Sequence, residues 1–492
     1  MKKIFKLQFL FAIAIFGLIG CTDNDDKLLE NNQTEVQNFI WRGLNNYYLW
    51  QQDVPDLADG KFATPYALND FIATKGSPEN TFQSLLFRPV SKFPDVNGVI
   101  SATDRFSVLV DDYTYLENLF QGIRKTSGLS IEVRYKSGTA GPLVGVVRYV
   151  MPNSDASTKN VKRGDVFYAV NGTVMTDDNI SSLFSNDDFT INFADYNNGN
   201  FTPNNINIAF TKTQVTENPV YINNVITVGS KKVAYLMYNS FTSNFNIELN
   251  NAFGQIKAAN CTDLVLDLRY NSGGAIETAT YLASMITGQF TNQLFTKEIW
   301  NPRIQAYYED NSPERLVNIF TDNIGGVGIN SLNLSKVYIL TTKRTASASE
   351  LLINGLKPYI QVVQIGTKTI GKNAGSITIY DSKNFAKSGA NGNHKYAMQP
   401  LVFKTVNRNN FGDYQAGLLP DFNLSEDLGN MGILGDSNEP LLRKALDLIG
   451  LRRSANQQPN VRVFENVPVN YDNFNTDMYK ETVPAGLAKL IK

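Results

Sequence analysis

The strongest constraint on the fold of this chain is an alternation of strand-like and helix-like segments between about residues 220 and 450. Four short apolar runs in this region have the character of strands, and they lie at 233–237, 263–268, 337–341 and 359–365. The third run is followed by a helix-like segment at 351–356. Strands that alternate with helices predict an α/β domain, which we place at residues 216–452.

The rest of the chain divides by pattern into three further regions. Residues 105–215 contain short alternating β runs punctuated by Gly and Asn, which predicts a β domain. Residues 22–104 begin with a polar, acidic tether and continue with apolar residues near helical spacing, which predicts a helical N-terminal cap. Residues 453–492 are polar, and we expect a peripheral C-terminal tail.

The first 21 residues have the pattern of a signal peptide. Lys2, Lys3 and Lys6 precede a mostly apolar run at 7–19, which is shorter than the roughly 20 residues that a membrane-spanning helix needs. The run ends at Cys21 in a sequence that resembles the bacterial lipobox. This resemblance implies a protein lipidated at Cys21 and anchored to a membrane of the bacterial cell envelope. An ordinary secretory signal is the alternative.

Composition excludes several classes of function. The net charge of −1 gives no global basic field that would attract nucleic acid. With one histidine and two cysteines, the chain is almost empty of zinc ligands, and we predict no metal or other cofactor. A Ser-His-Asp mechanism would depend on His394, which lies in a polar, turn-rich stretch and is better interpreted as a surface-loop residue.

The β region carries a pattern that resembles a PDZ domain. A proline-led turn at 151–156 is followed by Arg163-Gly164-Asp165-Val166 and then by Asn171-Gly172. The resemblance implies that the carboxylate-binding loop consists of Gly128, Leu129, Ser130 and Ile131. In such a loop successive backbone N–H groups bind a peptide carboxylate, and the adjacent strand edge pairs with the peptide. A β domain that packs without binding is the alternative.

The segment after the third core strand has two interpretations. Ser347 and Glu350 are three positions apart, as a helix capping box requires, and this stretch alone favours a plain helix start. Two other features favour catalysis. Lys372 follows Ser347 by 25 positions in a Gly-Lys sequence, and the strand at 263–268 leads into the pair Gly273-Gly274.

Together these three motifs resemble the carboxy-terminal processing peptidases, serine peptidase family S41. The resemblance implies an α/β peptidase core of the S41, crotonase-like type that acts on proteins or peptides. It makes Ser347 the nucleophile and Lys372 the general base. The backbone N–H of Ala348 and the Gly273-Gly274 turn would stabilise the oxyanion, and Glu350 would orient the lysine or the helix start.

Two consequences of the resemblance need the three-dimensional structure. A free lysine has a pKa near ~10.4, and lowering it to ~7 requires roughly 4 kcal/mol against the charged form, for which burial is the natural cause. Some family members carry a glutamine four positions after the lysine, where this chain has Ser376, so the third catalytic residue is open.

A non-catalytic envelope adaptor that binds peptide C-termini is the alternative function, and the sequence sets no oligomeric state.

Overall fold

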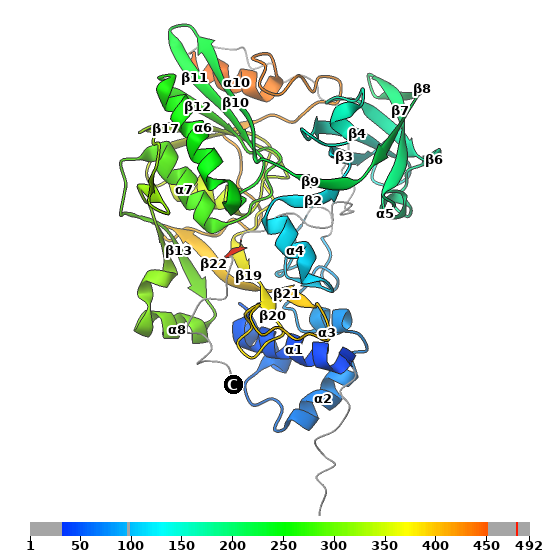
Figure 1. Ribbon diagram of the computed structural model, residues 1–492, viewed down its shortest axis with the longest axis vertical. Helices are drawn as coiled ribbons and strands as arrows, with labels where there is room; N and C mark the ends of the chain where they lie inside the picture. The colour runs from blue at the N-terminus through cyan, green and yellow to red at the C-terminus, as the bar shows by residue number, and fades with distance from the viewer. Residues whose placement is uncertain (1–31, 96–98, 451–478, 481–492) are drawn as a thin grey trace, which may run out of the picture.

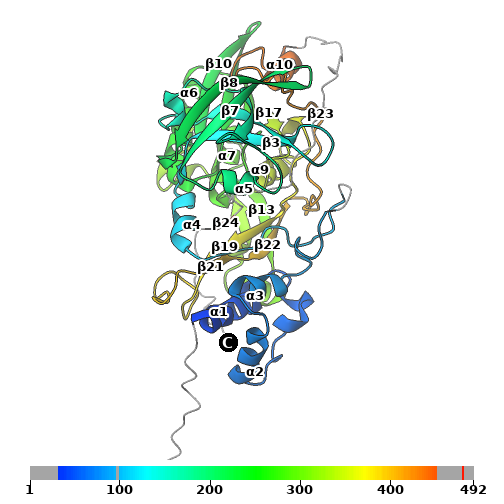
Figure 2. The same ribbon diagram turned by 90° about the vertical axis from the view of Figure 1, so that its right-hand side faces the viewer.

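The computed structural model describes residues 32–95, 99–450 and 479–480. The chain forms three parts: N-terminal helices at one end, a β domain, and an α/β core beside it (Figure 1). Turned by 90°, the helices still lie at one end, with the core and the β domain at the other (Figure 2). The multidomain α/β fold expected from the sequence is therefore confirmed. The predicted signal peptide, Cys21 and most of the C-terminal tail lie outside the described residues.

The core is built on a six-stranded sheet with the order β10-β11-β12-β17-β18-β23. Strand β10 is antiparallel to β11, and the other neighbouring pairs are parallel. The strands are β10 (Val220–Val228), β11 (Lys231–Tyr238), β12 (Asp263–Asp267), β17 (Lys336–Thr341), β18 (Gln361–Gly366) and β23 (Phe422–Asn423). The four strands predicted from the sequence correspond to β11, β12, β17 and β18.

Both faces of this sheet are covered by helices, which explains the apolar character of its strands. Alternate residues such as Leu264 and Leu266 contact one hydrophobic cluster, and their neighbour Val265 contacts another. The first cluster includes residues of α6 (Asn246–Ala258), α7 (Ile276–Thr287) and α9 (Ala348–Leu356), and the second includes α10 (Pro440–Ile449). The carboxyl ends of the parallel strands meet at one edge of the sheet, so the segments that follow β12, β17 and β18 converge there.

A second sheet in the core has the order β14-β13-β22-β19-β24. Its strands are β13 (Leu294–Trp300), β14 (Val317–Ile319), β19 (Ala374–Ile377), β22 (Leu401–Asn407) and β24 (Tyr479–Lys480). Strand β24 belongs to the predicted peripheral tail, but Tyr479 is only 1% exposed and its ring lies 4.1 Å from that of Phe120. Tyr479 is therefore buried and β24 pairs with β19, so the expectation of a peripheral location does not hold for these two residues.

The β domain contains a sheet with the order β3-β4-β5-β7-β8, in which β3 is an edge strand. Its strands are β3 (Leu129–Tyr135), β4 (Leu143–Val150), β5 (Val166–Val170), β7 (Asp188–Asn197) and β8 (Asn200–Thr211). The short helix α5 (Ile180–Leu183) lies beside this sheet, and β2 (Ile123–Thr126) pairs with β9 (Thr213–Thr216) where the chain enters and leaves the domain.

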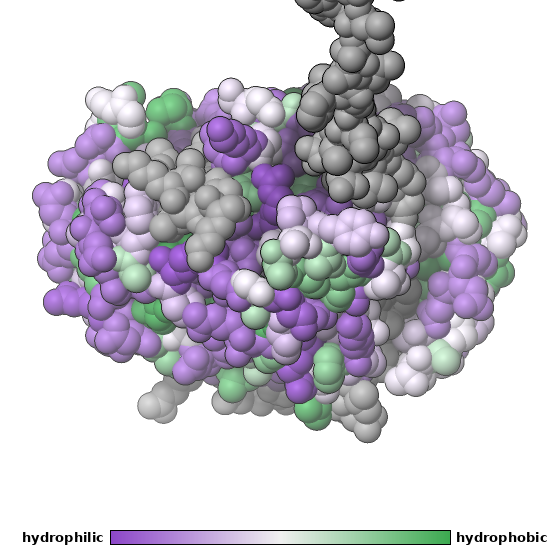
Figure 3. Space-filling model, turned by 90° about the horizontal axis from the view of Figure 1, so that it is seen from below, coloured by the Kyte–Doolittle hydropathy of each residue, from purple (hydrophilic) through white to green (hydrophobic). Residues whose placement is uncertain are grey.

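The N-terminal part contains α1 (Asn32–Tyr47), α2 (Pro65–Ala73) and α3 (Pro78–Ser84), as the apolar spacing predicts. Viewed from this end, the described surface is mainly hydrophilic with scattered hydrophobic residues (Figure 3). Within the described ranges no helix is long and apolar enough to cross a bilayer.

Candidate active site

Ser347 lies between the end of β17 and the start of α9, at the edge of the sheet where the parallel strands end. Its backbone angles are φ 63° and ψ −115°. A normal N-cap residue has an extended backbone, whereas strained backbone at a residue other than glycine costs about 1–3 kcal/mol and clusters at functional sites. A similar sharp strand-to-helix turn presents the nucleophile in α/β-hydrolases. A plain helix cap therefore does not account for the conformation of Ser347.

The carboxylate of Glu350 joins the serine segment to the lysine segment. Its Oε2 atom accepts hydrogen bonds from the backbone N–H groups of Ser347 and Lys372, each at 2.8 Å. The two nitrogens share one acceptor, so they lie no further apart than twice that distance. The Oε1 atom accepts from the backbone N–H of Gly371 at 2.7 Å and from the hydroxyl of Thr369.

Glu350 thus caps the helix and also holds the lysine loop, because its carboxylate accepts hydrogen bonds from the backbone of that loop. Its side chain is fully buried, and burial raises its pKa above the usual value although its four hydrogen bonds oppose the shift. The spacing to Ser347 predicted the cap. The contacts to Gly371 and Lys372 join residues 21 and 22 positions apart, and local sequence patterns do not detect them.

Lys372 is 1% exposed, and its Nζ atom lies 4.9 Å from the centre of the Phe106 ring. The neighbouring residue Arg105 donates hydrogen bonds from Nη2 to the carbonyl oxygens of Ile370 at 3.2 Å and Gly371 at 2.9 Å. The end of the N-terminal region therefore covers and fixes the lysine loop. Sequence reasoning missed both Arg105 and Phe106, because the contacts span more than 260 positions.

The Gly273-Gly274 turn follows β12 and lies beside the serine segment. The carbonyl oxygen of Asn271 accepts hydrogen bonds from the Ala346 N–H at 3.2 Å and from the Ser349 hydroxyl at 3.1 Å. The N–H of Gly273 donates to the side chain of Asn271 at 2.9 Å, so this donor is already engaged within the turn. Of the two glycines, Gly274 is therefore the better candidate for an oxyanion donor.

Ala348 is the first residue of α9, so its N–H has no acceptor within the helix. Partial positive charge accumulates at this end of a helix and favours an anion there. Ser347 and Ala348 are both fully buried, so a substrate reaches them only after neighbouring groups move. The site thus brings together a strained serine, a buried lysine and the first N–H group of a helix, which has no acceptor within that helix.

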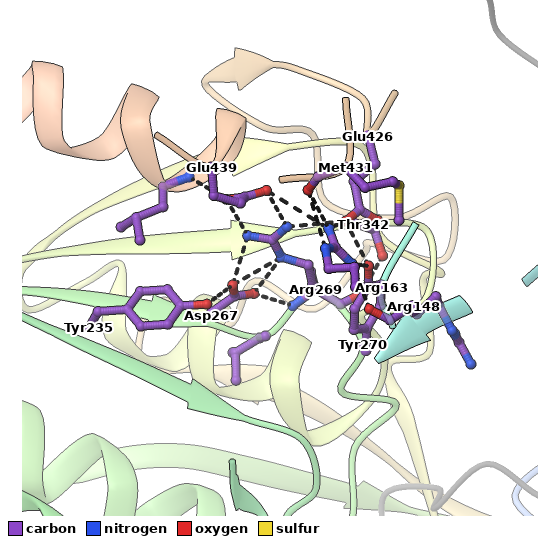
Figure 4. A network of polar contacts seen from close by, with 12 residues as sticks. Arg148, Arg163, Tyr235, Asp267, Arg269, Tyr270, Thr342, Glu426, Met431 and Glu439 are labelled. Atoms are coloured by element: carbon purple, nitrogen blue, oxygen red, sulfur yellow. Dashed lines mark hydrogen bonds and ion pairs between the residues drawn. The ribbon is translucent and has the colours of Figure 1, made fainter. Parts of the chain in front are cut away.

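A buried ionic network supports the segment that leads into the glycine turn (Figure 4). Arg269 is fully buried and contacts Asp267 at 2.8 Å and Glu439 at 2.7 Å. Glu426 contacts Arg269 at 3.1 Å, and burial would raise its pKa, but the charges of Arg269 and Arg163 lower that pKa well below the usual value.

The same network connects the core to the β domain. Arg163, in the Arg-Gly-Asp sequence of the β domain, donates at 2.6 Å to the hydroxyl of Tyr270 and to Glu426. The hydroxyl of Tyr270 donates in turn to Glu426 at 2.6 Å (Figure 4). Tyr270 is three positions before Gly273, so the β domain contacts the segment that leads into the turn.

The predicted carboxylate-binding loop lies at the start of β3. Leu129, Ser130 and Ile131 line a cavity of about 500 Å³, whereas Gly128 forms the turn before them with φ +87°. A Cβ atom at Gly128 would lie 1.9 Å from Ser154 Oγ, so the turn requires glycine. The Gly128 N–H donates to the Thr126 hydroxyl at 3.1 Å.

His394 lies elsewhere, in a loop whose residues Asn393 and Lys395 are exposed, but its own ring packs against the N-terminal helices. Its Nε2 atom is 3.1 Å from Asp381, its side chain is 8% exposed, and its ring faces Phe39 at 6.4 Å. The expectation of a surface-loop histidine is therefore wrong in its burial. Ser376, the alternative partner for Lys372, is buried in β19. Among the described residues, no group of three His, Cys, Asp or Glu side chains is placed to hold a metal ion.

Known proteins resemble this chain in sequence over the segments that form the site. Residues 232–387 match peptidase family S41, and residues 35–108 match the peptidase S41 N-terminal domain. The first range contains Ser347, Lys372 and the glycine turn, and the second contains Arg105 and Phe106. Residues 109–231, which include the β domain, lie outside both ranges.

Individual relatives agree with these matches. The chain is 27% identical over 165 residues to a carboxyl-terminal-processing protease of Picosynechococcus sp., covering 34% of this chain and 35% of that protein. It is 24% identical over 261 residues to a chloroplastic C-terminal processing peptidase of Tetradesmus obliquus, covering 50% of this chain and 51% of that protein. The chain therefore spans a third to a half of the length of these curated relatives.

The structural similarity extends further than the sequence similarity. A protein of Bacteroides fragilis described as an S41 protease superposes with a TM-score of 0.60 at 25% identity. The superposition covers 84% of this chain and 96% of that one. The likeness thus includes the N-terminal part and the β domain as well as the core.

Proposed function

Because this chain carries the two domains of peptidase family S41, we propose that it is a serine endopeptidase in which Ser347 and Lys372 form a catalytic dyad. The single observation that carries the proposal is the Glu350 carboxylate, which holds the backbone of a strained serine and of a buried lysine on one oxygen atom. A structural cap needs no such link to a lysine 22 positions away. The proposed substrates are proteins or peptides cut near their carboxy-termini.

In the proposed reaction, neutral Lys372 accepts the proton of the Ser347 hydroxyl as the Ser347 oxygen attacks the carbonyl carbon of the scissile peptide. The negative charge on the former carbonyl oxygen is stabilised by the N–H groups of Ala348 and Gly274. The lysine then gives its proton to the leaving amine, and an acyl-enzyme forms. Water then attacks the carbonyl carbon of this ester while Lys372 accepts a proton from the water. The proton passes to the Ser347 oxygen as the carboxylic acid product leaves. Burial of Lys372 favours the neutral amine that the first step requires.

The proposal is tested with the purified protein on an unstructured substrate such as casein. We expect cleavage by the wild type and none by Ser347→Ala or Lys372→Met. Lys368→Met is the matched control, because Lys368 is an exposed lysine of the same loop, and this variant should keep full activity. Undiminished cleavage by Ser347→Ala would refute the assignment, and no cleavage by any form with intact peptide binding would favour an adaptor.

We also propose that the protein is lipidated at Cys21 and acts in the bacterial cell envelope. The support is the short apolar run after three lysines, followed directly by this cysteine. In a bacterial host, the wild type should incorporate labelled fatty acid and sediment with membranes, whereas Cys21→Ser should do neither. Fatty-acid labelling that persists in Cys21→Ser would contradict this part of the proposal.

A further inference from the structure

The cavity beside the predicted peptide-binding loop carries a concentration of positive charge. It is lined by Leu129, Ser130 and Ile131 of β3 and by Ser181 of α5, and it extends to Ser272, next to the glycine turn. Five cationic side chains and one carboxylate line it: Arg124, Lys125, Arg148, Lys212, Arg344 and Glu217. The whole chain has a net charge of only −1, so this charge is a local feature.

The cations come from both parts of the molecule that meet at the cavity. Arg124 and Lys125 belong to β2, and Arg148 belongs to β4. Arg344 belongs to the core and is three positions before Ser347. An anionic group bound beside Arg344 and Ser272 would therefore contact residues that lie three positions before Ser347 and one position before Gly273.

Nearby carboxylates offset only part of this charge. Asp187 pairs with Lys125 at 2.5 Å, and Glu132 pairs with Arg134 at 3.2 Å and also interacts electrostatically with Arg344 and Arg148. Glu217 already accepts hydrogen bonds from Tyr149 at 3.0 Å and from Asn239 at 3.2 Å. With Arg134 counted beside the five lining cations, and Asp187 and Glu132 counted beside Glu217, six cations face three carboxylates, so the surroundings of the cavity stay positive.

The backbone beside the cavity is suited to an extended peptide. Strand β3 pairs with β4 on one side only, because it is the edge strand of its sheet. A peptide that adds to such an edge places every second side chain towards the same wall. An extended tail in this position would present its carboxyl groups to the cations at regular intervals.

We propose that the cavity selects peptides whose last residues are acidic, so that this chain acts on proteins with acidic carboxy-terminal tails. The inference rests on the proposed peptidase function and specifies its substrate class. The cations complement side-chain carboxylates in addition to the terminal carboxylate, and complementary charge mainly determines specificity and the rate of association. Because the cavity extends to Ser272, the bound tail would lie next to the Gly273-Gly274 turn.

Binding is measured by fluorescence anisotropy with the full chain carrying Ser347→Ala, so that no peptide is consumed. The probes are labelled decapeptides that end in Asp-Asp-Ala, Asn-Asn-Ala or Lys-Lys-Ala, each as a free acid and as an amide. We expect the Asp peptide to bind about tenfold more tightly than the Asn peptide, and the Lys peptide to bind most weakly. About 0.5 M salt should remove most of the difference.

Variants locate the effect. Arg124→Gln and Lys212→Gln should each reduce the preference for the Asp peptide about threefold. The matched control is Lys136→Gln, which removes an exposed lysine of the β domain that does not line the cavity and should leave the preference unchanged. An equal loss in the control would refute the role of the cavity.

The outcomes separate this inference from the peptidase proposal. Equal binding of the Asp and Asn peptides overturns the inference, even if the wild type cuts both. A preference that disappears on amidation also overturns it, because the cavity would then bind only a terminal carboxylate. Tighter binding of the acidic peptide without any cleavage by the wild type upholds the charge preference and refutes the peptidase.

Discussion

Replacing Gly274 with alanine tests whether the glycine turn is part of the catalytic machinery. The residue has φ +137°, and an added Cβ atom would lie 2.4 Å from the carbonyl oxygen of Phe241 and 2.7 Å from its carbonyl carbon. Real Cβ contacts are at least 3.0 Å, so the two backbone segments must separate by about 0.6 Å, the difference between 3.0 and 2.4 Å. Backbone atoms cannot move aside as a flexible side chain would.

This separation would displace the proposed oxyanion donor. The N–H of Phe241 donates to Gly273 at 2.9 Å and that of Ala275 donates to Phe241 at 2.8 Å, so the strain acts directly on the turn. Loss of one oxyanion donor lowers kcat by roughly 10²–10³. We expect Gly274→Ala to lower kcat/KM for a peptide substrate by about this factor.

Gly229→Ala is the matched control, because it also places alanine at positive φ, here +61°, but meets no atom within 4 Å. Both substitutions carry the cost of positive-φ backbone, about 1–2 kcal/mol, and Gly274→Ala adds the cost of the clash with Phe241; denaturant unfolding measures the total for each variant. Only Gly274→Ala should also lose activity. If both variants kept kcat/KM within about threefold of wild type, the turn would not be an oxyanion site and the reasoning would be wrong.

Two further predictions concern Glu350 and Glu426. Glu350→Gln should lower kcat/KM by about two orders of magnitude, because an amide offers one acceptor oxygen to a set of four donors. Displacement of catalytic groups from their positions typically lowers activity by this factor. Activity within threefold of wild type would limit Glu350 to a capping role. Glu426 has a lowered pKa, so its stabilisation is present above the usual glutamate pKa and is lost as pH falls below it. Glu426→Gln should therefore lower the free energy of unfolding by about 3 kcal/mol at neutral pH. The free energy measured by denaturant unfolding should also fall less steeply on acidification than in the wild type, and an unchanged dependence on pH would contradict this assignment.

The sequence determined the strands of the core and the motifs of the site. The predicted runs correspond to β11, β12, β17 and β18, because strands buried on both faces must be nearly all apolar and are therefore visible locally. The motifs at Ser347, Lys372 and Gly273-Gly274 were likewise found from their order and spacing. They lie together because the carboxyl ends of parallel strands meet at one edge of the sheet.

The role of Glu350 shows what the sequence left open. Its spacing to Ser347 alone favoured a helix cap, and only the fold shows that the same carboxylate also binds the backbone of Lys372. The conformation of Ser347 is likewise a property of the tertiary structure, since local preferences alone favour an extended backbone at a helix cap.

The other contributions that only the tertiary structure decided come from segments far apart in the chain. Arg105 and Phe106 reach the lysine loop across more than 260 positions, and Tyr479 is buried in β24, the edge strand of the second sheet, although its neighbourhood in the sequence is polar. Such contacts depend on how whole elements pack, and no periodicity or motif near either partner encodes them. The sequence alone thus determined the elements and the reactive residues, and the packing of distant segments decided how those residues are held.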